Sequence, residues 1–130
     1  TRRSSDLELL YMHKNKTGEL IKAAVVCGAT LGNADQGDLS YLKEYGDKLG
    51  LAFQIKDDIL DVIGDVSILG KNIKSDESNN KTTFITMYGL EKCMQKCNNL
   101  TQECLKLLKQ VKVNTENLEE ITEFLLKREY

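Results

Sequence analysis

The segment between positions 49 and 63 limits the possible folds most, because it is apolar around most of a helix circumference. At about 100° per residue, its Leu, Ile, Val, Ala and Phe side chains leave a polar arc only about 100° wide. A helix of this kind is buried on most sides, so other helices have to pack around it. The narrow polar arc carries Gln54, Asp57, Asp58, Asp61 and Asp65.

The rest of the chain also has helical patterns. No stretch alternates apolar and polar residues as a half-buried strand does, and the chain contains no proline that would break a helix. We therefore predict one all-α unit without repeats or linkers, with a polar Gly-, Ser-, Asn- and Lys-rich loop at 64–81. Helices are expected at about 6–16, continuing to Leu31 after a break or kink at Thr17-Gly18, and at about 38–63, 82–87, 90–111 and 116–128.

Composition narrows the possible partners. With 130 residues and 41% hydrophobic content, the chain can bury the core of a single domain. The net charge of −2 and the lack of a dense basic cluster make nucleic acid an unexpected partner. The longest apolar run, at 23–27, is too short to span a bilayer, and no signal-peptide pattern is present.

The four cysteines, Cys27, Cys93, Cys97 and Cys104, form no CxxC pair. The last three share one helix face with several leucines, which favours reduced thiols in an apolar helix seam over a metal site. Reduced thiols fit a cytoplasmic protein. The single histidine, His13, offers little for a zinc centre and is interpreted as a structural or surface residue.

The acidic arc can be a solvated helix face, which is the usual role of such a stripe, or it can line a site. Carboxylates three and four residues apart repel one another unless a cation lies between them. Here the arc is so narrow that we favour a site. Mg²⁺ is the natural cation, because it binds a few carboxylates together with substrate phosphate oxygens. Asp65 either extends the arc or is simply an acid at the helix end.

Three motifs occur in order: Lys16-Thr17-Gly18; Phe53-Gln54 followed by Asp57-Asp58-Ile59-Leu60-Asp61; and Leu69-Gly70-Lys71 with Lys81-Thr82-Thr83-Phe84. Together they resemble the C-terminal half of the trans-isoprenyl diphosphate synthases, the farnesyl and geranylgeranyl diphosphate synthase family. The resemblance extends over essentially the whole chain and is closest to the bacterial farnesyl diphosphate synthases. It implies half of an isoprenoid-synthase helical barrel.

The resemblance also implies an activity, the Mg²⁺-dependent condensation of dimethylallyl or geranyl diphosphate with isopentenyl diphosphate to give farnesyl diphosphate. By resemblance, Asp57 binds the magnesium directly and Asp61 holds the metal or its waters. Asp58 orients waters or neighbouring lysines.

The remaining implied site residues bind the diphosphates or face the developing carbocation. Lys16, Lys71 and Lys81 meet diphosphate oxygens as compact positive charges. Thr17 and Gln54 present oxygen dipoles to the cation, and with Lys16 they are the implied catalytic residues. The loop at 64–81 is expected to close over the diphosphates and exclude water.

The sequence lacks the family's first aspartate-rich motif, and it begins at Thr1 without an initiator methionine. We therefore expect a piece of a longer protein, roughly its second half, that is inactive alone. Apolar faces left uncovered are expected to make copies associate, through the 23–29 face or the helix that carries the acidic motif. One alternative is a geranylgeranyl or longer-chain diphosphate synthase. Another is a non-catalytic helical partner subunit, but the retained site residues argue against it.

Overall fold

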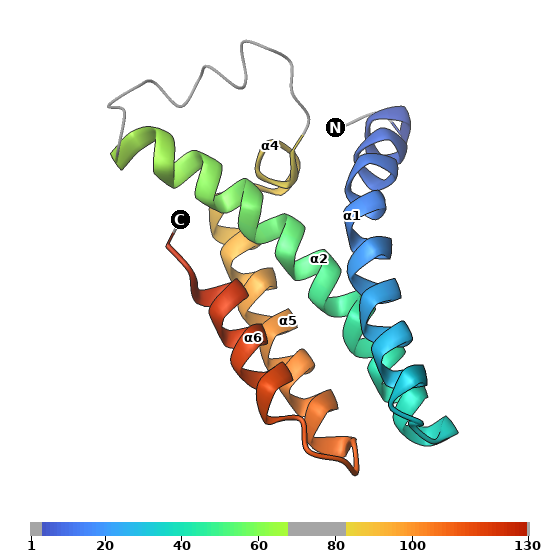
Figure 1. Ribbon diagram of the computed structural model, residues 1–130. Coiled ribbons are helices and arrows are strands. Elements are labelled where there is room, and N and C mark those ends of the chain that lie inside the picture. Colours follow the sequence, from blue (N-terminus) through green and yellow to red (C-terminus); the bar gives the residue numbers. More distant parts are fainter. Residues whose placement is uncertain (1–3, 68–82, 130) are drawn as a thin grey trace.

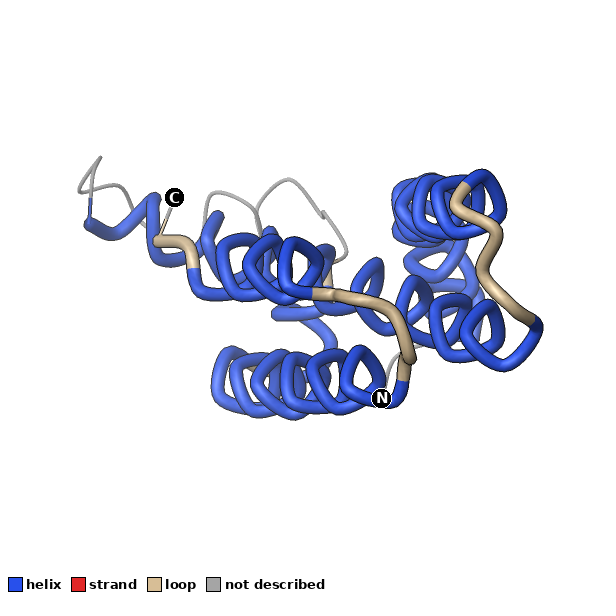
Figure 2. The backbone as a smooth tube through the Cα atoms, turned by 60° about the horizontal axis from the view of Figure 1, so that its bottom comes forward, coloured by secondary structure: helices blue, strands red, loops and turns tan. Residues whose placement is uncertain are grey.

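The computed structural model describes residues 4–67 and 83–129, with only the backbone described at 4–15 and 65–67. Over these residues the chain forms helices and no strand, which confirms the all-α prediction (Figure 1). Short loops separate most of the helices (Figure 2). The helices are α1 (Ser4–Leu31), α2 (Gln36–Ser67), α4 (Phe84–Tyr88), α5 (Leu90–Gln110) and α6 (Glu116–Lys127).

Helix α2 is the central element. It crosses the molecule diagonally, with α1 against one side and the antiparallel pair α5 and α6 against another (Figure 1). The short helix α4 contacts both α2 and α5. This arrangement is the one required by a helix that is apolar around most of its circumference. In the part of the chain that the structure describes, no helix is both long and apolar enough to cross a membrane.

The connection between α1 and α2 is fixed by local capping and by a contact with the connection between α5 and α6. Asn33, just after α1, has a φ of 60°, a left-handed conformation that asparagine tolerates at a helix end. The Asp35 carboxylate accepts a hydrogen bond from the Asp38 amide at 2.8 Å, which caps the first turn of α2. The buried Asp38 carboxylate accepts the Lys112 amide at 3.1 Å, so the two connections are held together.

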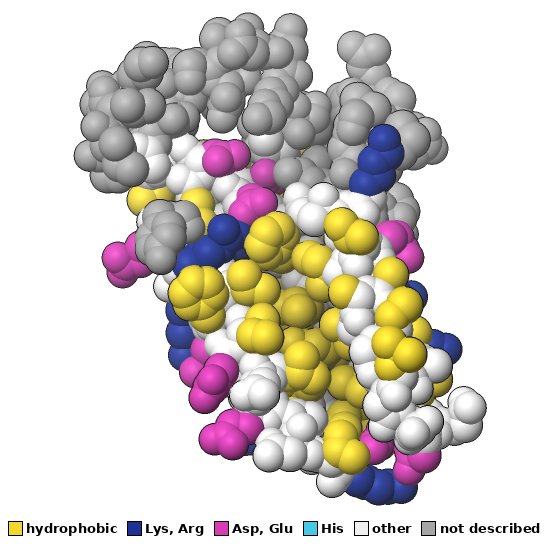
Figure 3. Space-filling view, in the orientation of Figure 1, with side chains coloured by type: hydrophobic (Ala, Val, Ile, Leu, Met, Phe, Trp, Pro, Cys, Tyr) yellow, Lys and Arg dark blue, Asp and Glu magenta, His cyan; other side chains and the backbone are white. Residues whose placement is uncertain are grey.

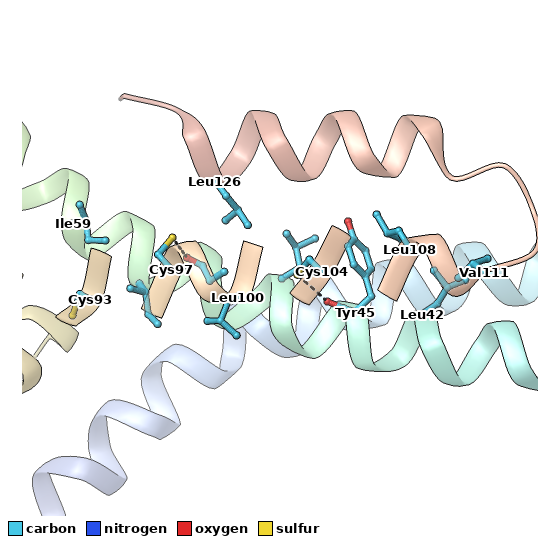
Figure 4. Close-up of a cluster of buried hydrophobic side chains, with 13 residues drawn as sticks. Leu42, Tyr45, Ile59, Cys93, Cys97, Leu100, Cys104, Leu108, Val111 and Leu126 are labelled. Carbon is cyan, nitrogen blue, oxygen red and sulfur yellow. Dashed lines mark hydrogen bonds between the residues drawn. The ribbon is translucent and has the colours of Figure 1, made fainter. Parts of the chain in front are cut away.

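The core lies between α2, α5 and α6 (Figure 4). Cys93, Cys97 and Cys104 are 2%, 3% and 0% exposed and none forms a disulfide, which confirms the predicted apolar seam. Burial raises the pKa of the Cys104 thiol to about 12. The Tyr45 hydroxyl, buried in the same core, lies 2.6 Å from the Thr122 hydroxyl and ties α2 to α6.

Of the break or kink predicted at Thr17-Gly18, the break is wrong, because α1 is continuous through these residues. Gly18 lies instead where α1 and α2 approach most closely. A Cβ atom built on Gly50 of α2 would be 2.8 Å from the Gly18 Cα atom. Further along, a Cβ atom on Gly46 would be 3.1 Å from the Lys22 Cα atom, so the two helices run antiparallel. Gly46 and Gly50 of α2 allow this close packing, and the low helix propensity of a single glycine such as Gly18 does not interrupt a packed helix.

The predicted start of the polar loop at position 64 is also wrong, because α2 continues to Ser67. Gly64 is tolerated within a helix at a cost of about 1 kcal/mol, and no proline follows to stop the helix. The remainder of the predicted loop, including Lys71 and Lys81, lies outside the described residues. The other helix ends agree with the predicted ranges to within about two residues, the usual scatter of such boundaries.

Candidate functional site

The acidic face of α2 is formed by residues spaced three and four apart, as the sequence predicts. Its members differ in exposure. Gln54 and Asp58 are 8% and 3% exposed, whereas the Asp57 side chain is 39% exposed and Asp61 is exposed. The four residues therefore do not act as one solvated stripe, because two are packed inside and two face outward.

Asp58 is bound to the start of α4. Its Oδ2 atom accepts a hydrogen bond from the Phe84 amide at 2.8 Å. Thr83 and Thr86 cap the same helix start. The Thr83 hydroxyl accepts the Thr86 amide at 3.1 Å, and the Thr86 hydroxyl accepts the Thr83 amide at 2.9 Å. Asp58 thereby holds α4 against α2, and one of its two carboxylate oxygens is engaged by the α4 backbone.

Asp57 lies against Arg128, the residue that follows α6. The Arg128 guanidinium donates to Oδ1 of Asp57, and its Nε atom donates to the Leu125 carbonyl at 2.9 Å. The guanidinium carbon also lies 4.8 Å from the centre of the Phe53 ring, within the range of a cation–π contact. Basic and acidic side chains meet where the end of α6 reaches α2 (Figure 3).

Sequence reasoning missed Arg128. Its separation from Asp57 is 71 residues, and an arginine just after a helix is an ordinary feature of helix C-termini. No local pattern connects the two residues. Only the packing of α6 along α2 brings them together.

Lys16 and Thr17 directly precede the antiparallel crossing of α1 and α2. Because Gly18 contacts Gly50, the preceding residues of α1 lie toward the Gln54 end of α2. Lys16 is exposed and Thr17 is half-buried. Gly18 of the first motif therefore contacts α2 four residues before Gln54 of the second motif, while Lys71 and Lys81 of the third lie outside the described residues.

Among the described residues, no group of three or more His, Cys, Asp or Glu side chains could hold a metal ion. A cavity of about 460 Å³ opens between α2, α4 and α5, with Leu51, Ile55, Phe84 and Tyr88 in its mainly apolar wall. Leu51 and Ile55 lie on a different face of α2 from Asp57, so this cavity is separate from the outward-facing carboxylates. Asp57, which is paired with Arg128, and the exposed Asp61 therefore lie outside this cavity.

The chain belongs to the Polyprenyl synthetase family, whose profile matches residues 2–125. It is a family of prenyltransferases. The chain is 38% identical over 121 residues to a farnesyl diphosphate synthase of Micrococcus luteus, which covers 93% of this chain and 42% of that protein. Another farnesyl diphosphate synthase, from Escherichia coli (strain K12), is also 38% identical over 121 residues, with 90% and 40% covered.

A third relative carries a different product in its name. The geranylgeranyl diphosphate synthase of Cyanophora paradoxa is 39% identical over 95 residues, which cover 73% of this chain and 32% of that protein. The chain thus spans less than half the length of each of these relatives.

Proposed function

We propose that this chain is the C-terminal part of a Mg²⁺-dependent prenyltransferase that makes farnesyl diphosphate from isopentenyl diphosphate and an allylic diphosphate, dimethylallyl or geranyl. The observation that carries the proposal is the outward pair Asp57 and Asp61 on α2, at the end of the helix toward which Lys16 and Thr17 lie. Two farnesyl diphosphate synthases at 38% identity support the same reaction.

The donor chemistry of this face suits magnesium. Mg²⁺ prefers oxygen ligands and is commonly held by one or two carboxylates together with waters and substrate phosphate oxygens. Asp57 and Asp61, one helical turn apart, would hold it. Asp58, with one oxygen engaged by the Phe84 amide, would orient neighbouring groups instead. When bound, the metal would supply positive charge to the departing diphosphate.

The other site residues would act on the substrates directly. In the reaction, the allylic carbon–oxygen bond breaks and diphosphate leaves with the electron pair. The isopentenyl double bond then forms the new carbon–carbon bond and a proton is lost. Lys16, with Lys71 and Lys81, would bind diphosphate oxygens, and Thr17 and Gln54 would direct oxygen dipoles at the allylic cation. Gln54 is 8% exposed, so its side chain is largely shielded from solvent.

Because the chain spans less than half of its relatives' length, we propose that catalysis needs the rest of the protein, including a second acidic motif that faces α2. The 130-residue chain alone would then form no product. A cytoplasmic, homo-oligomeric enzyme is part of the same proposal. A geranylgeranyl diphosphate synthase is the second candidate, favoured by the relative from Cyanophora paradoxa.

The test is product analysis with the upstream coding region restored. The protein is incubated with Mg²⁺, labelled isopentenyl diphosphate and either dimethylallyl or geranyl diphosphate, and the prenyl products are separated by chromatography. A Mg²⁺-dependent C15 product supports the proposal, and a C20 product supports the second candidate. If a folded, complete protein gives no product, the chain is part of a non-catalytic partner subunit.

A further inference from the structure

The Arg128 side chain is fixed from three directions, although it lies beyond the last helix. Its Nε atom is bound by the Leu125 carbonyl, its terminal nitrogen by Asp57, and its flat face covers Phe53. The side chain is only 18% exposed as a result. These contacts dock the end of α6 on α2 through the carboxylate that we propose as a magnesium ligand.

A guanidinium and a divalent cation compete for one carboxylate. Asp57 carries a single negative charge, and its Oδ1 atom already accepts from Arg128. Mg²⁺ requires oxygen ligands at about 2.0–2.1 Å, which would place it within a few ångströms of the guanidinium. Two positive groups that close repel each other strongly in a partly buried site. Arg128 engages only the Oδ1 atom of Asp57, so charge repulsion would weaken the pairing when a cation binds the same carboxylate through either oxygen.

Release of Arg128 is structurally simple. The Arg128 backbone is extended, with φ −61° and ψ 153°, and α6 ends one residue earlier at Lys127. The side chain can swing away without breaking a backbone hydrogen bond within the helix. The Asp57 side chain is 39% exposed, so a hydrated cation can reach it from solvent.

We propose that Arg128 is a built-in counter-ion of Asp57 that a divalent cation displaces, so that cation binding undocks the end of α6 from α2. The inference rests on the proposed function, because it takes Asp57 as the residue that receives the cation. In the cation-free protein, Arg128 neutralises Asp57 and holds the carboxylate in place beside Phe53. In the cation-bound protein, Arg128 is free to interact with other anions.

A double-mutant cycle on the folded chain tests this proposal. The unfolding equilibrium is measured by urea denaturation for the wild type, Asp57→Asn, Arg128→Gln and the double variant, first in EDTA and then in millimolar Mg²⁺. In EDTA the two residues should be coupled by about fivefold in the equilibrium constant, the upper range for a partly exposed ion pair. In Mg²⁺ the coupling should disappear. Absence of coupling in EDTA, or equal coupling in both buffers, overturns the proposal.

Cation affinity provides the second readout. Arg128→Gln should bind Mn²⁺, used as a paramagnetic probe, about fivefold more tightly than the wild type, because the competing charge is removed. Lys127→Gln is the matched control: it removes the same charge one residue earlier, from a side chain that lies 3.9 Å from Glu123 and is 66% exposed. Equal effects of the two variants would indicate general electrostatics and overturn the proposal.

The two proposals fail in distinguishable ways. A complete protein without product, whose Asp57–Arg128 coupling still disappears in Mg²⁺, would refute the enzymatic function and leave the counter-ion role standing. A complete protein that makes product, with coupling unchanged by Mg²⁺, would refute the counter-ion role alone.

Discussion

The closest approach of α1 and α2 predicts opposite effects for two glycine-to-alanine changes in the same helix. At Gly50, the new methyl group would be 2.8 Å from the Gly18 Cα atom and 3.1 Å from the Gly18 carbonyl oxygen. Both are backbone atoms, so the two helices have to separate. At Gly64, further along α2, a methyl group would meet nothing within 4 Å.

The expected magnitudes follow from packing and helix propensity. Overpacking a tight helix contact costs about 1–3 kcal/mol, and alanine gains up to about 1 kcal/mol over glycine within a helix. Gly50→Ala should therefore lower the free energy of unfolding by about 1–2 kcal/mol. Gly64→Ala should raise it by up to about 1 kcal/mol. The steric conflict arises only on the α2 side, because a Cβ atom on Gly18 of α1 would meet nothing within 4 Å. Gly18→Ala should therefore raise the free energy of unfolding as Gly64→Ala does.

Urea denaturation followed by circular dichroism measures these differences, with the denaturant dependence required to stay constant across the variants. A shift of about 1 kcal/mol corresponds to about 4 °C in Tm for a domain of this size. If Gly50→Ala is as stable as Gly64→Ala, the close approach of α1 and α2 is wrong. The proposal that Lys16 and Thr17 act together with the acidic face would then lose its support.

Four further results are expected. In the complete enzyme, Asp57→Ala should lower turnover about 100-fold or more with the fold intact, and activity within a few-fold of wild type would refute its role. Asp58→Asn should weaken the hydrogen bond from the Phe84 amide at the start of α4. The free energy of unfolding should fall by about 1 kcal/mol, and hydrogen exchange at the Phe84 amide should become faster. Unchanged exchange would count against the contact between Asp58 and Phe84. Burial raises the pKa of the Cys104 thiol from 9.0 to about 12, so between these pH values only the unfolded chain ionises this thiol. The free energy of unfolding should therefore fall as the pH rises above about 9. A Cys104→Ala variant should lose part of this pH dependence. Sedimentation should show that copies of the isolated chain associate. Leu31 on α1 is 85% exposed, and apolar side chains line the hollowed face between α1 and α6 (Figure 3). A monomer at micromolar concentration would contradict this prediction.

The two variants at Asp57 answer different questions. Asp57→Ala in the complete enzyme tests the proposed chemistry, whereas Asp57→Asn in the isolated chain tests the contact with Arg128. The first depends on the rest of the protein, and the second does not.

Periodicity predicted the helical elements well where each helix has its own signals. Helix α5 was predicted at 90–111 and extends over Leu90–Gln110, because its apolar face repeats regularly and Gly89, with a φ of 87°, precedes it. The buried cysteine face followed from the same repeat. The acidic arc of α2 also followed from spacing alone, since residues three and four apart share a face in any helix.

Gly18 and Gly64 show where local reasoning failed. The sequence pattern predicts an interruption at each glycine, yet both lie within continuous helices. A glycine's low helix propensity is about 1 kcal/mol, which a packed interface easily outweighs. Whether such an interface exists depends on the partner helix, about which the local sequence says nothing.

The all-helical class, the apolar faces and the order of the motifs can be read from the sequence alone, because helix formation and amphipathicity depend on residues only a few positions apart. Tertiary structure decided which members of the acidic arc face outward, that Asp58 holds α4, and that Arg128 lies against Asp57. These contacts join residues 26 and 71 positions apart. They exist because α4 and α6 pack along α2 at particular angles, and that geometry arises from the combined fit of all the core side chains.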